Sequence, residues 1–432
     1  MPDDRYLDDS IIHAAVVLAN ADTLIPDGAL FLHDGLIAEI GPWRDIRRRH
    51  PKAADWSAGK HLITPGLVNI HTHLELGYLR GKIPAPAKFP DWVCRLFELA
   101  PPPEKLEHAV AESVIGGITE CHRYGVTAIG DITRYAAITR RAAADRPMDG
   151  ISFGEITAMG KARGQLEVRI GAAEISARLA AGMQIGLSPH APYSVEGPAL
   201  RQIVQHANAS HRPLAMHLAE LPYEREFLRD FSGPLGRDWP LRKIIDVLDG
   251  EIPTFDGSPV AWAAQWGLLK SDQPVILVHV NYADDADIRL LAGHRQISVA
   301  MCPRTRHYFG HHLIAEHPCL KMLQADIRVC IATDSLASTP DLNLLAEAAC
   351  ARKDLPSLSW ATLFQMVTQW PAEAMRLKAG RLHRGFRADM AVFPMSSVPR
   401  SVESAVAELI CAHPPAAAVV MGSQLVYGRL YI

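Results

Sequence analysis

The sequence predicts an α/β protein with a distorted TIM-type (β/α)8 barrel and a small β-sandwich domain formed by both chain ends. From Leu67 onward, short apolar runs alternate with stretches of helical periodicity. Eight such strand–helix units occupy roughly 270 residues, close to the usual barrel size of about 250. The residues on either side have a β-like texture instead. These three observations favour a barrel inserted into a smaller β domain.

The predicted barrel strands are apolar runs that end in polar residues. In chain order they are residues 67–70, 126–132, 150–156, 183–187, 213–217, 274–278, 296–300 and 327–332. Helices are predicted between them, most clearly from Glu104 to Tyr124, where apolar residues recur at helical spacing and Gly125 follows. A doubly wound open sheet is the alternative fold. No Gly-x-Gly-x-x-Gly loop follows the first strand, which disfavours that alternative.

Both chain ends carry β signals. Near the N-terminus, Ala29–His33 and Leu36–Ile40 flank Asp34-Gly35, a pair typical of a type I′ hairpin turn. After Met375 the texture again becomes β-like. We therefore expect a β-sandwich from residues 1–63 and 380–432, with the barrel in residues 64–379. The irregular, charged segment 222–257 is long enough to predict a functional covering loop.

Composition limits the classes of partner. Lys and Arg total 44 against 47 Asp and Glu, a net charge of −3, which argues against nucleic acid or an anionic membrane. The seven cysteines form no Cys-x-x-Cys pair, so neither a disulfide framework nor a cysteine-based zinc ribbon is indicated. Residues 1–5 lack a basic signal region, and the run Ile11–Leu18 is too short to span a bilayer. We expect a cytoplasmic protein with a small-molecule partner. The sequence leaves open whether the chain forms a homodimer.

Metal-competent side chains recur where the predicted strands end, which is where barrels carry their catalytic groups. His71 and His73 follow the first strand, and positions i and i+2 of a strand share one face. The fourth, fifth, sixth and eighth strands lead into His190, His217, His279 and Asp334. A bare His-x-His pair is common near turns. Its recurrence with four other strand-end residues predicts a metal centre.

We predict that His71, His73, His217 and Asp334 hold one divalent metal. Imidazoles with one carboxylate suit Zn²⁺ or Fe²⁺ better than Mg²⁺ or Ca²⁺, and zinc is the first choice. Such a set leaves one position for a water molecule, whose pKa the metal lowers. His279 has two open roles, as a further ligand or as a group that holds the water and polarises the substrate. The second role is favoured.

Glu220 lies three residues after His217, in the segment His217-Leu218-Ala219-Glu220. At this spacing its carboxyl group can lie beside the metal without binding it. There it can move a proton from the attacking water to a leaving group or a ring nitrogen. The alternative is a surface glutamate at the start of the next helix.

Several motifs occur in an order that resembles the amidohydrolase superfamily. They are Pro65-Gly-Leu-Val-Asn-Ile-His-Thr-His73, Ser188-Pro-His-Ala-Pro-Tyr-Ser194, His217-Leu-Ala-Glu220, Cys302-Pro-Arg-Thr305, Ala332-Thr-Asp-Ser-Leu-Ala-Ser338 and Ala388-Asp-Met-Ala-Val392. The chain is most similar to the branch with S-adenosylhomocysteine, guanine, cytosine and aminodeoxyfutalosine deaminases and triazine chlorohydrolases. The resemblance implies one metal on a distorted barrel with a composite β-sandwich. It also implies hydrolytic loss of ammonia, or a similar group, from a ring carbon.

Three features depart from the family pattern. No lysine ends the fourth strand, where binuclear members carry a carbamylated bridge, so a two-metal hydrolase is disfavoured. Glu75 takes a position where many deaminases have a small or apolar residue, and it is similar to the His-Leu-Glu of aminodeoxyfutalosine deaminases. Thr305-Arg306 replaces the usual Ser-Asn after Cys-Pro-Arg, so the substrate wall after the seventh strand can differ.

The resulting hypothesis is a metal-dependent aminohydrolase acting on an amino-substituted N-heterocycle such as an aminopurine nucleoside derivative. Asp334 would help to deprotonate the attacking water, Glu220 would protonate the ring nitrogen, and His279 would steady the tetrahedral intermediate. The candidate substrate contacts are His190, Glu75 and Arg304. The alternatives are loss of a halide, an alkylamine or a cyclic amide nitrogen, a catalytically silent metal-binding homologue, and an NAD enzyme on an open sheet.

Overall fold

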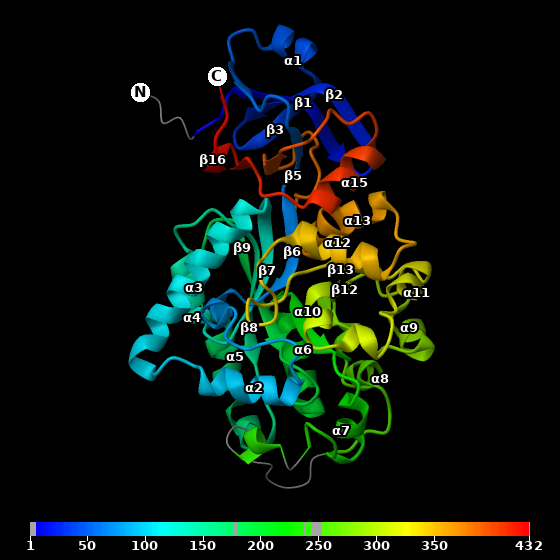
Figure 1. Cartoon of the computed structure of the whole chain (residues 1–432). Coiled ribbons are helices and arrows are strands. Elements are labelled where there is room, and N and C mark those ends of the chain that lie inside the picture. The colour runs from blue at the N-terminus through cyan, green and yellow to red at the C-terminus, as the bar shows by residue number, and fades with distance from the viewer. Residues whose placement is uncertain (1–5, 176–178, 237–238, 244–252, 432) are drawn as a thin grey trace.

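The computed structural model describes residues 6–175, 179–236, 239–243 and 253–431. In this part of the chain two eight-stranded sheets form separate bodies. Figure 1 shows the sheet built from the chain ends stacked on one end of the barrel, with both termini on the side of that sheet. The helices α2 and α7 lie at the opposite end of the molecule.

The second sheet is a barrel of parallel strands in sequential order, as predicted. Its strands are β6 (Leu67–Thr72), β7 (Val126–Thr133), β8 (Asp149–Ile156), β9 (Met183–Pro189), β10 (Leu214–Leu218), β11 (Val275–His279), β12 (Ile297–Met301) and β13 (Arg328–Ile331). A parallel bridge between Thr72 and Asp334 brings the first strand against the chain that follows the last. The carboxyl ends of all eight strands therefore meet at one mouth.

Helices surround the barrel between its strands (Figure 1). They are α2 (Phe89–Glu98), α3 (Pro103–Arg123), α4 (Ala136–Ala143), α5 (Leu166–Glu174), α6 (Gly197–Ala209), α7 (Glu224–Asp230), α8 (Pro259–Gln265), α9 (Asp285–Leu291), α10 (Pro303–Tyr308), α11 (Cys319–Gln324), α12 (Leu344–Asp354), α13 (Trp360–Val367) and α14 (Gln369–Ala374). Short 3-10 turns are η1 (Leu74–Leu79), η2 (Gly160–Gln165), η3 (Pro240–Lys243), η4 (Leu268–Lys270) and η5 (His311–Leu313). Helix α3 ends as predicted because Gly125, with φ +79°, breaks it.

The first sheet joins both ends of the chain, which confirms the predicted composite β domain. Its strands are β1 (Ser10–Asn20), β2 (Thr23–His33), β3 (Leu36–Pro42), β4 (Ala54–Ser57), β5 (Leu62–Pro65), β14 (Met390–Phe393), β15 (Ala418–Met421) and β16 (Gln424–Gly428). Helices α1 (Trp43–Arg49) and α15 (Val402–Ala412) accompany it. The junction is the antiparallel pair of β5 with β14. The exact boundaries at residues 63/64 and 379/380 stay a prediction.

Strand β14 couples the sheet domain to the barrel through its alternating side chains. Met390 and Val392 are buried in the core of the sheet domain. Ala391 and Phe393 point to the other face and join the large core that contains the barrel helices. This alternation is the period of two expected for a strand. It seals the end of the barrel away from the mouth.

The described part of segment 222–257, which was predicted to be irregular, includes regular secondary structure. It contains α7 and η3, while residues 237–238 and 244–252 lie outside the described residues. In the described residues no helix is long and apolar enough to cross a membrane.

We predict that Phe393→Ala destabilises the barrel as well as the sheet domain. Phe393 has no exposed surface, and Phe→Ala in a core typically costs about 3–5 kcal/mol. Urea unfolding should move to clearly lower denaturant for both tryptophan fluorescence and circular dichroism. Val398→Ala, at a half-exposed position, is the control and should behave as wild type. An unchanged midpoint for Phe393→Ala would contradict the coupling.

Candidate active site

Four imidazoles and one carboxylate converge at the mouth of the barrel. His73 Nε2 lies 3.2 Å from His217 Nε2. Asp334 Oδ1 lies 3.3 Å from His71 Nε2 and 3.8 Å from His73 Nε2. The His279 ring centroid is 5.8 Å from that of His71 and 5.6 Å from that of His217. The structure thus brings together all the residues predicted to form the metal centre.

Side-chain bonds between the first and last strands fix this arrangement. The Asn69 amide donates to Thr333 Oγ1 (2.7 Å) and accepts from the Thr333 backbone N–H (3.2 Å). The Thr72 hydroxyl donates to the backbone carbonyl of Asp334 (3.0 Å). On β10, His217 Nδ1 lies 3.1 Å from the His190 carbonyl oxygen. That contact assigns the proton of His217 to Nδ1 and leaves Nε2 as a lone-pair donor.

Strained backbone accompanies the same strand ends. His279 (φ 72°), Val280 (φ 50°) and Asp334 (φ 60°) all have left-handed φ values, as does Ala219 (φ 49°). Such a conformation is rare for non-glycine residues and a clear outlier for a β-branched valine. Strain of this kind costs about 1–3 kcal/mol per residue and clusters at functional sites. Two of these residues, His279 and Asp334, carry side chains that line the cavity at the mouth.

The donor set fits a divalent cation. Among the described residues, neither ring nitrogen of His71 has a hydrogen-bond partner, nor has His279 Nδ1, although all are buried. Burial lowers the pKa of His71 and of His73 well below the usual value, and that of His217 to about 4. The rings are therefore neutral and carry free lone pairs. His71, His73 and Asp334 offer ligand atoms within 4.8 Å of one another, as do His71, His217 and His279.

Glu220 is buried beside this cluster and is not a surface residue. The backbone N–H groups of Ala219, Glu220 and Leu221 all donate to the carboxylate of Glu224, which fixes the turn after β10. The Glu220 carboxyl oxygen lies 3.5 Å from His279 Nε2. Burial, followed by the nearby Asp334 charge, raises the pKa of Glu220 well above its usual value. This carboxyl group therefore favours its protonated form.

A cavity of about 250 Å³ opens directly onto the cluster. His73, His217, Glu220, His279 and Asp334 lie along it. Its remaining wall is largely aromatic and apolar, from Phe89, Trp92, Leu96, Phe97, Tyr193, Trp239 and Phe309. A flat ring fits this combination of an apolar wall and a few convergent polar groups. Trp239 shows that segment 222–257 does contribute to the cavity wall.

Two predicted substrate contacts lie in the same cavity. His190 lines it, with Nδ1 2.6 Å from Ser194 Oγ. Glu75 is buried, accepts the Arg134 backbone N–H (3.0 Å), and accepts a hydrogen bond from the Thr133 hydroxyl. Desolvation raises the pKa of Glu75 to about 7.

The sequence analysis missed three charged residues of the cavity wall, Arg134, Glu155 and Arg169. Arg134 and Glu155 line it, with Arg134 Nε 3.5 Å from Glu155 Oε1. They stand at the ends of β7 and β8. Applying the strand-end rule to the second and third strands identifies both.

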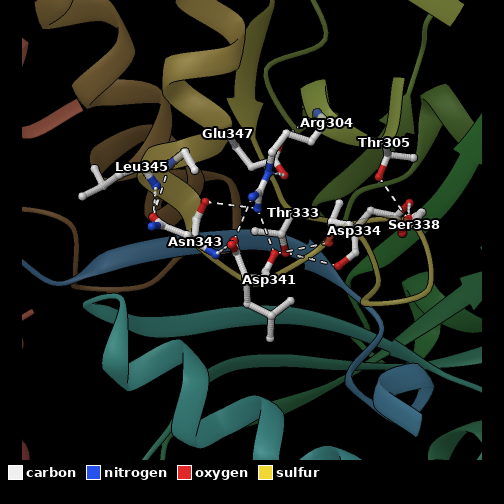
Figure 2. Close-up of polar contacts among 12 residues, drawn as sticks. Arg304, Thr305, Thr333, Asp334, Ser338, Asp341, Asn343, Leu345 and Glu347 are labelled. Carbon is white, nitrogen blue, oxygen red and sulfur yellow. Dashed lines mark hydrogen bonds and ion pairs between the residues drawn. The ribbon is translucent and has the colours of Figure 1, made fainter. Parts of the chain in front are cut away.

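Arg304 is the one predicted contact that the structure keeps out of the cavity. Figure 2 shows its guanidinium turned towards Glu347 and Asp341. Arg304 Nε donates to Glu347 Oε1 (2.6 Å), and Arg304 Nη1 donates to Asp341 Oδ1 (2.8 Å). The backbone carbonyl of Asp341 accepts a third hydrogen bond, from Arg304 Nη2 (2.8 Å). Glu347 is fully buried, so it holds this cation in place. Arg304 thus ties α10 to α12 and to the residues just before it. Its contact with a substrate stays a prediction.

A family model for the amidohydrolase family matches residues 62–425, which include both the barrel and the junction strands. The chain belongs to this family. The predicted resemblance is thereby confirmed, and so is the expectation of a hydrolase acting on C–N bonds other than peptide bonds.

Named relatives cover most of the amidohydrolase chain. An aminodeoxyfutalosine deaminase of Deinococcus radiodurans is 29% identical over 366 residues, 81% of each chain. A 5-methylthioadenosine/S-adenosylhomocysteine deaminase of Pyrococcus furiosus is 25% identical over 399 residues, covering 88% of this chain and 85% of its own. Helicobacter pylori aminofutalosine deaminase, solved with methylthio-coformycin, superposes with a TM-score of 0.84 at 19% identity, over 97% of this chain and all of its own. At that identity the superposition shows the fold alone.

We predict that His217→Ala and Asp334→Ala lose tightly held metal. Each removes a donor from the converging set, and the remaining neutral rings bind a cation less strongly. Metal analysis after gel filtration through a weak chelator should give close to one equivalent for wild type and well under half for either variant. His108→Ala, at an exposed position of α3, should match wild type. Full metal content in both site variants would contradict the assignment.

Proposed function

We propose that this amidohydrolase is a zinc-dependent aminohydrolase that releases ammonia from an amino-substituted N-heterocycle. The substrate class would be aminopurine nucleoside derivatives, since the named relatives are deaminases of such compounds. The observation that carries the proposal is the buried Glu220 carboxyl group between the donor cluster and an aromatic cavity. A metal site alone would need no such acid.

His71, His73, His217 and Asp334 would hold the cation. A bound Zn²⁺ would lower the pKa of a water molecule towards neutrality and supply the nucleophile. Iron is the alternative metal. Zinc is preferred here because a solved adenosine deaminase of Xanthomonas campestris with a related fold (TM-score 0.80) contains bound zinc. The side chains of the cluster suit zinc because they are mostly imidazole.

Asp334 would accept a proton from the attacking water. Its Oδ2 accepts a hydrogen bond from Ser338 Oγ (3.0 Å), which Figure 2 shows, while Oδ1 faces His71 and His73. Its orientation is therefore fixed before substrate enters.

Glu220 would donate its proton to the ring nitrogen next to the carbon under attack. Because burial raises its pKa well above the usual value, this group keeps its proton to a higher pH than an ordinary carboxyl group does. His279 lies within 3.5 Å of Glu220 and would steady the oxygen of the tetrahedral centre. The two groups approach the substrate from adjacent strand ends, β10 and β11.

The cavity wall would select a flat substrate. Rings such as Phe89, Trp92 and Phe309 offer stacking surfaces, and aromatic pairs of this kind stabilise by about 0.5–1.5 kcal/mol beyond their buried area. We propose that His190 and Glu75 contact polar groups of the substrate. Both are held in place by hydrogen bonds before any substrate binds.

We predict that the protein releases ammonia from an aminopurine nucleoside when it is assayed with a panel of aminopurine nucleosides, pterins, cytosines and aminotriazines. At least one aminopurine nucleoside should give stoichiometric ammonia and the corresponding oxo product by mass spectrometry. Chlorotriazines test chloride as the alternative leaving group. If the protein releases chloride from them and no ammonia from any amino compound, the deaminase proposal is wrong, although the protein would still be a hydrolase.

We predict that Glu220→Gln lowers kcat by about 10²- to 10⁴-fold, the range of general acid–base catalysis. The amide keeps the size of the side chain but cannot supply the proton. KM and metal content should change little, because the group acts in the transition state. Glu112→Gln, at an exposed position of α3, is the control. Turnover of Glu220→Gln within a few-fold of wild type would exclude Glu220 as the acid.

A further inference from the structure

We propose a second zinc site, on the outer surface of the barrel, formed by His307, Cys350 and Asp354. These residues offer ligand atoms that all lie within 4.8 Å of one another. They come from two neighbouring elements, α10 and α12. None of the three lines the cavity of the proposed active site. The ligand would be Zn²⁺ or another thiophilic divalent cation.

The spacing within α12 supports the site. Cys350 and Asp354 stand one helical turn apart, so their side chains share one face of the helix. Opposite them, His307 of α10 places Nε2 2.9 Å from Asp354 Oδ1 and 2.8 Å from Oδ2. An imidazole, a thiol and a carboxylate are thus presented from two sides towards one point.

His312 supplies a further observation that points to a ligand. Its ring lies parallel to that of His307, with centroids 3.9 Å apart and an angle of 1° between the planes. Its Nδ1 is buried and has no hydrogen-bond partner in the part of the chain that the structure describes. A buried nitrogen left unpaired is destabilising, so a bound cation would relieve that cost. Rotation of this side chain would offer that nitrogen as a fourth ligand; otherwise water completes a tetrahedral set.

The donor chemistry selects the cation. Thiolate, imidazole and carboxylate are the ligands of Zn²⁺, whereas Mg²⁺ and Ca²⁺ prefer oxygen alone. The guanidinium of Arg306 lies near Asp354 and Cys350 and opposes a further positive charge. It is engaged by Asn281 Oδ1 (3.0 Å) and the Ala315 carbonyl (2.7 Å). We therefore expect binding that is weaker than at the barrel mouth and that exchanges during gel filtration.

A cation here would brace α10 against α12 beside the Arg304–Glu347 pair that already joins them. Helix α10 ends at Tyr308, and the next residue, Phe309, caps the helix and forms part of the cavity wall. The site thus lies one short helix away from the substrate pocket without contributing a group to it.

Cobalt titration of the zinc-loaded protein tests the site. Thiolate ligation gives Co²⁺ a charge-transfer band in the near ultraviolet, and the donor set at the barrel mouth contains no cysteine. Wild type should develop this band and saturate at one added equivalent. Cys350→Ser should abolish it, whereas Cys411→Ser, at an exposed cysteine, should keep it. Absence of the band from folded wild type, or its persistence in Cys350→Ser, would overturn the proposal.

A calorimetric titration with zinc gives an independent readout. Asp354→Asn and His307→Gln should each weaken uptake of the second equivalent at least tenfold, even if Cys350→Ser folds poorly. Wild-type affinity in both variants would overturn the proposal. Ammonia release does not enter either test, so failure of the proposed deaminase activity is distinguishable from failure of this site.

Discussion

The burial of three neutral imidazoles around one carboxylate constrains the rest of this structure. Each ring nitrogen removed from water without a partner carries a desolvation cost, and His71 carries two. The Nε2 atoms of His73 and His217 lie 3.2 Å apart, and this contact gives a partner to only these two ring nitrogens. A divalent cation would accept one lone pair from each ring and would balance the charge of Asp334. The donor set therefore favours the proposed metal site.

The barrel provides the rigidity that this cluster requires. Asn69 and Thr72 on the first strand form hydrogen bonds with Thr333 and Asp334, which follow the last strand. The contacts that close the barrel therefore also position the metal-binding side chains. The opposite end is covered by the sheet domain through Phe393, which leaves the mouth as the open face. Left-handed φ values at His279 and Asp334 show that the donors are oriented at a backbone cost that packing elsewhere offsets.

Much of this arrangement could be predicted from sequence because it depends on short-range periodicity. A strand shows its core-facing residues every second position, and a barrel places every strand end at one mouth, so His71, His73 and His217 follow from the strands alone. Arg304 also follows a strand, yet its long side chain turns back to Glu347 of α12 and to Asp341 just before that helix, partners that are far away in the sequence. Such long-range pairing leaves no periodic signal. The aromatic wall was beyond prediction for the same reason, since Phe89 and Trp92 come from a helix after β6 and Trp239 from the long segment after β10.

The most direct test of the metal cluster is anomalous diffraction at the zinc absorption edge from crystals of the purified protein. The strongest peak should lie at the barrel mouth, within bonding distance of His71, His73, His217 and Asp334. Glu220 should stand close to it without making a bond. A peak elsewhere with none at the mouth, in crystals that contain zinc, would contradict a metal centre formed by these residues.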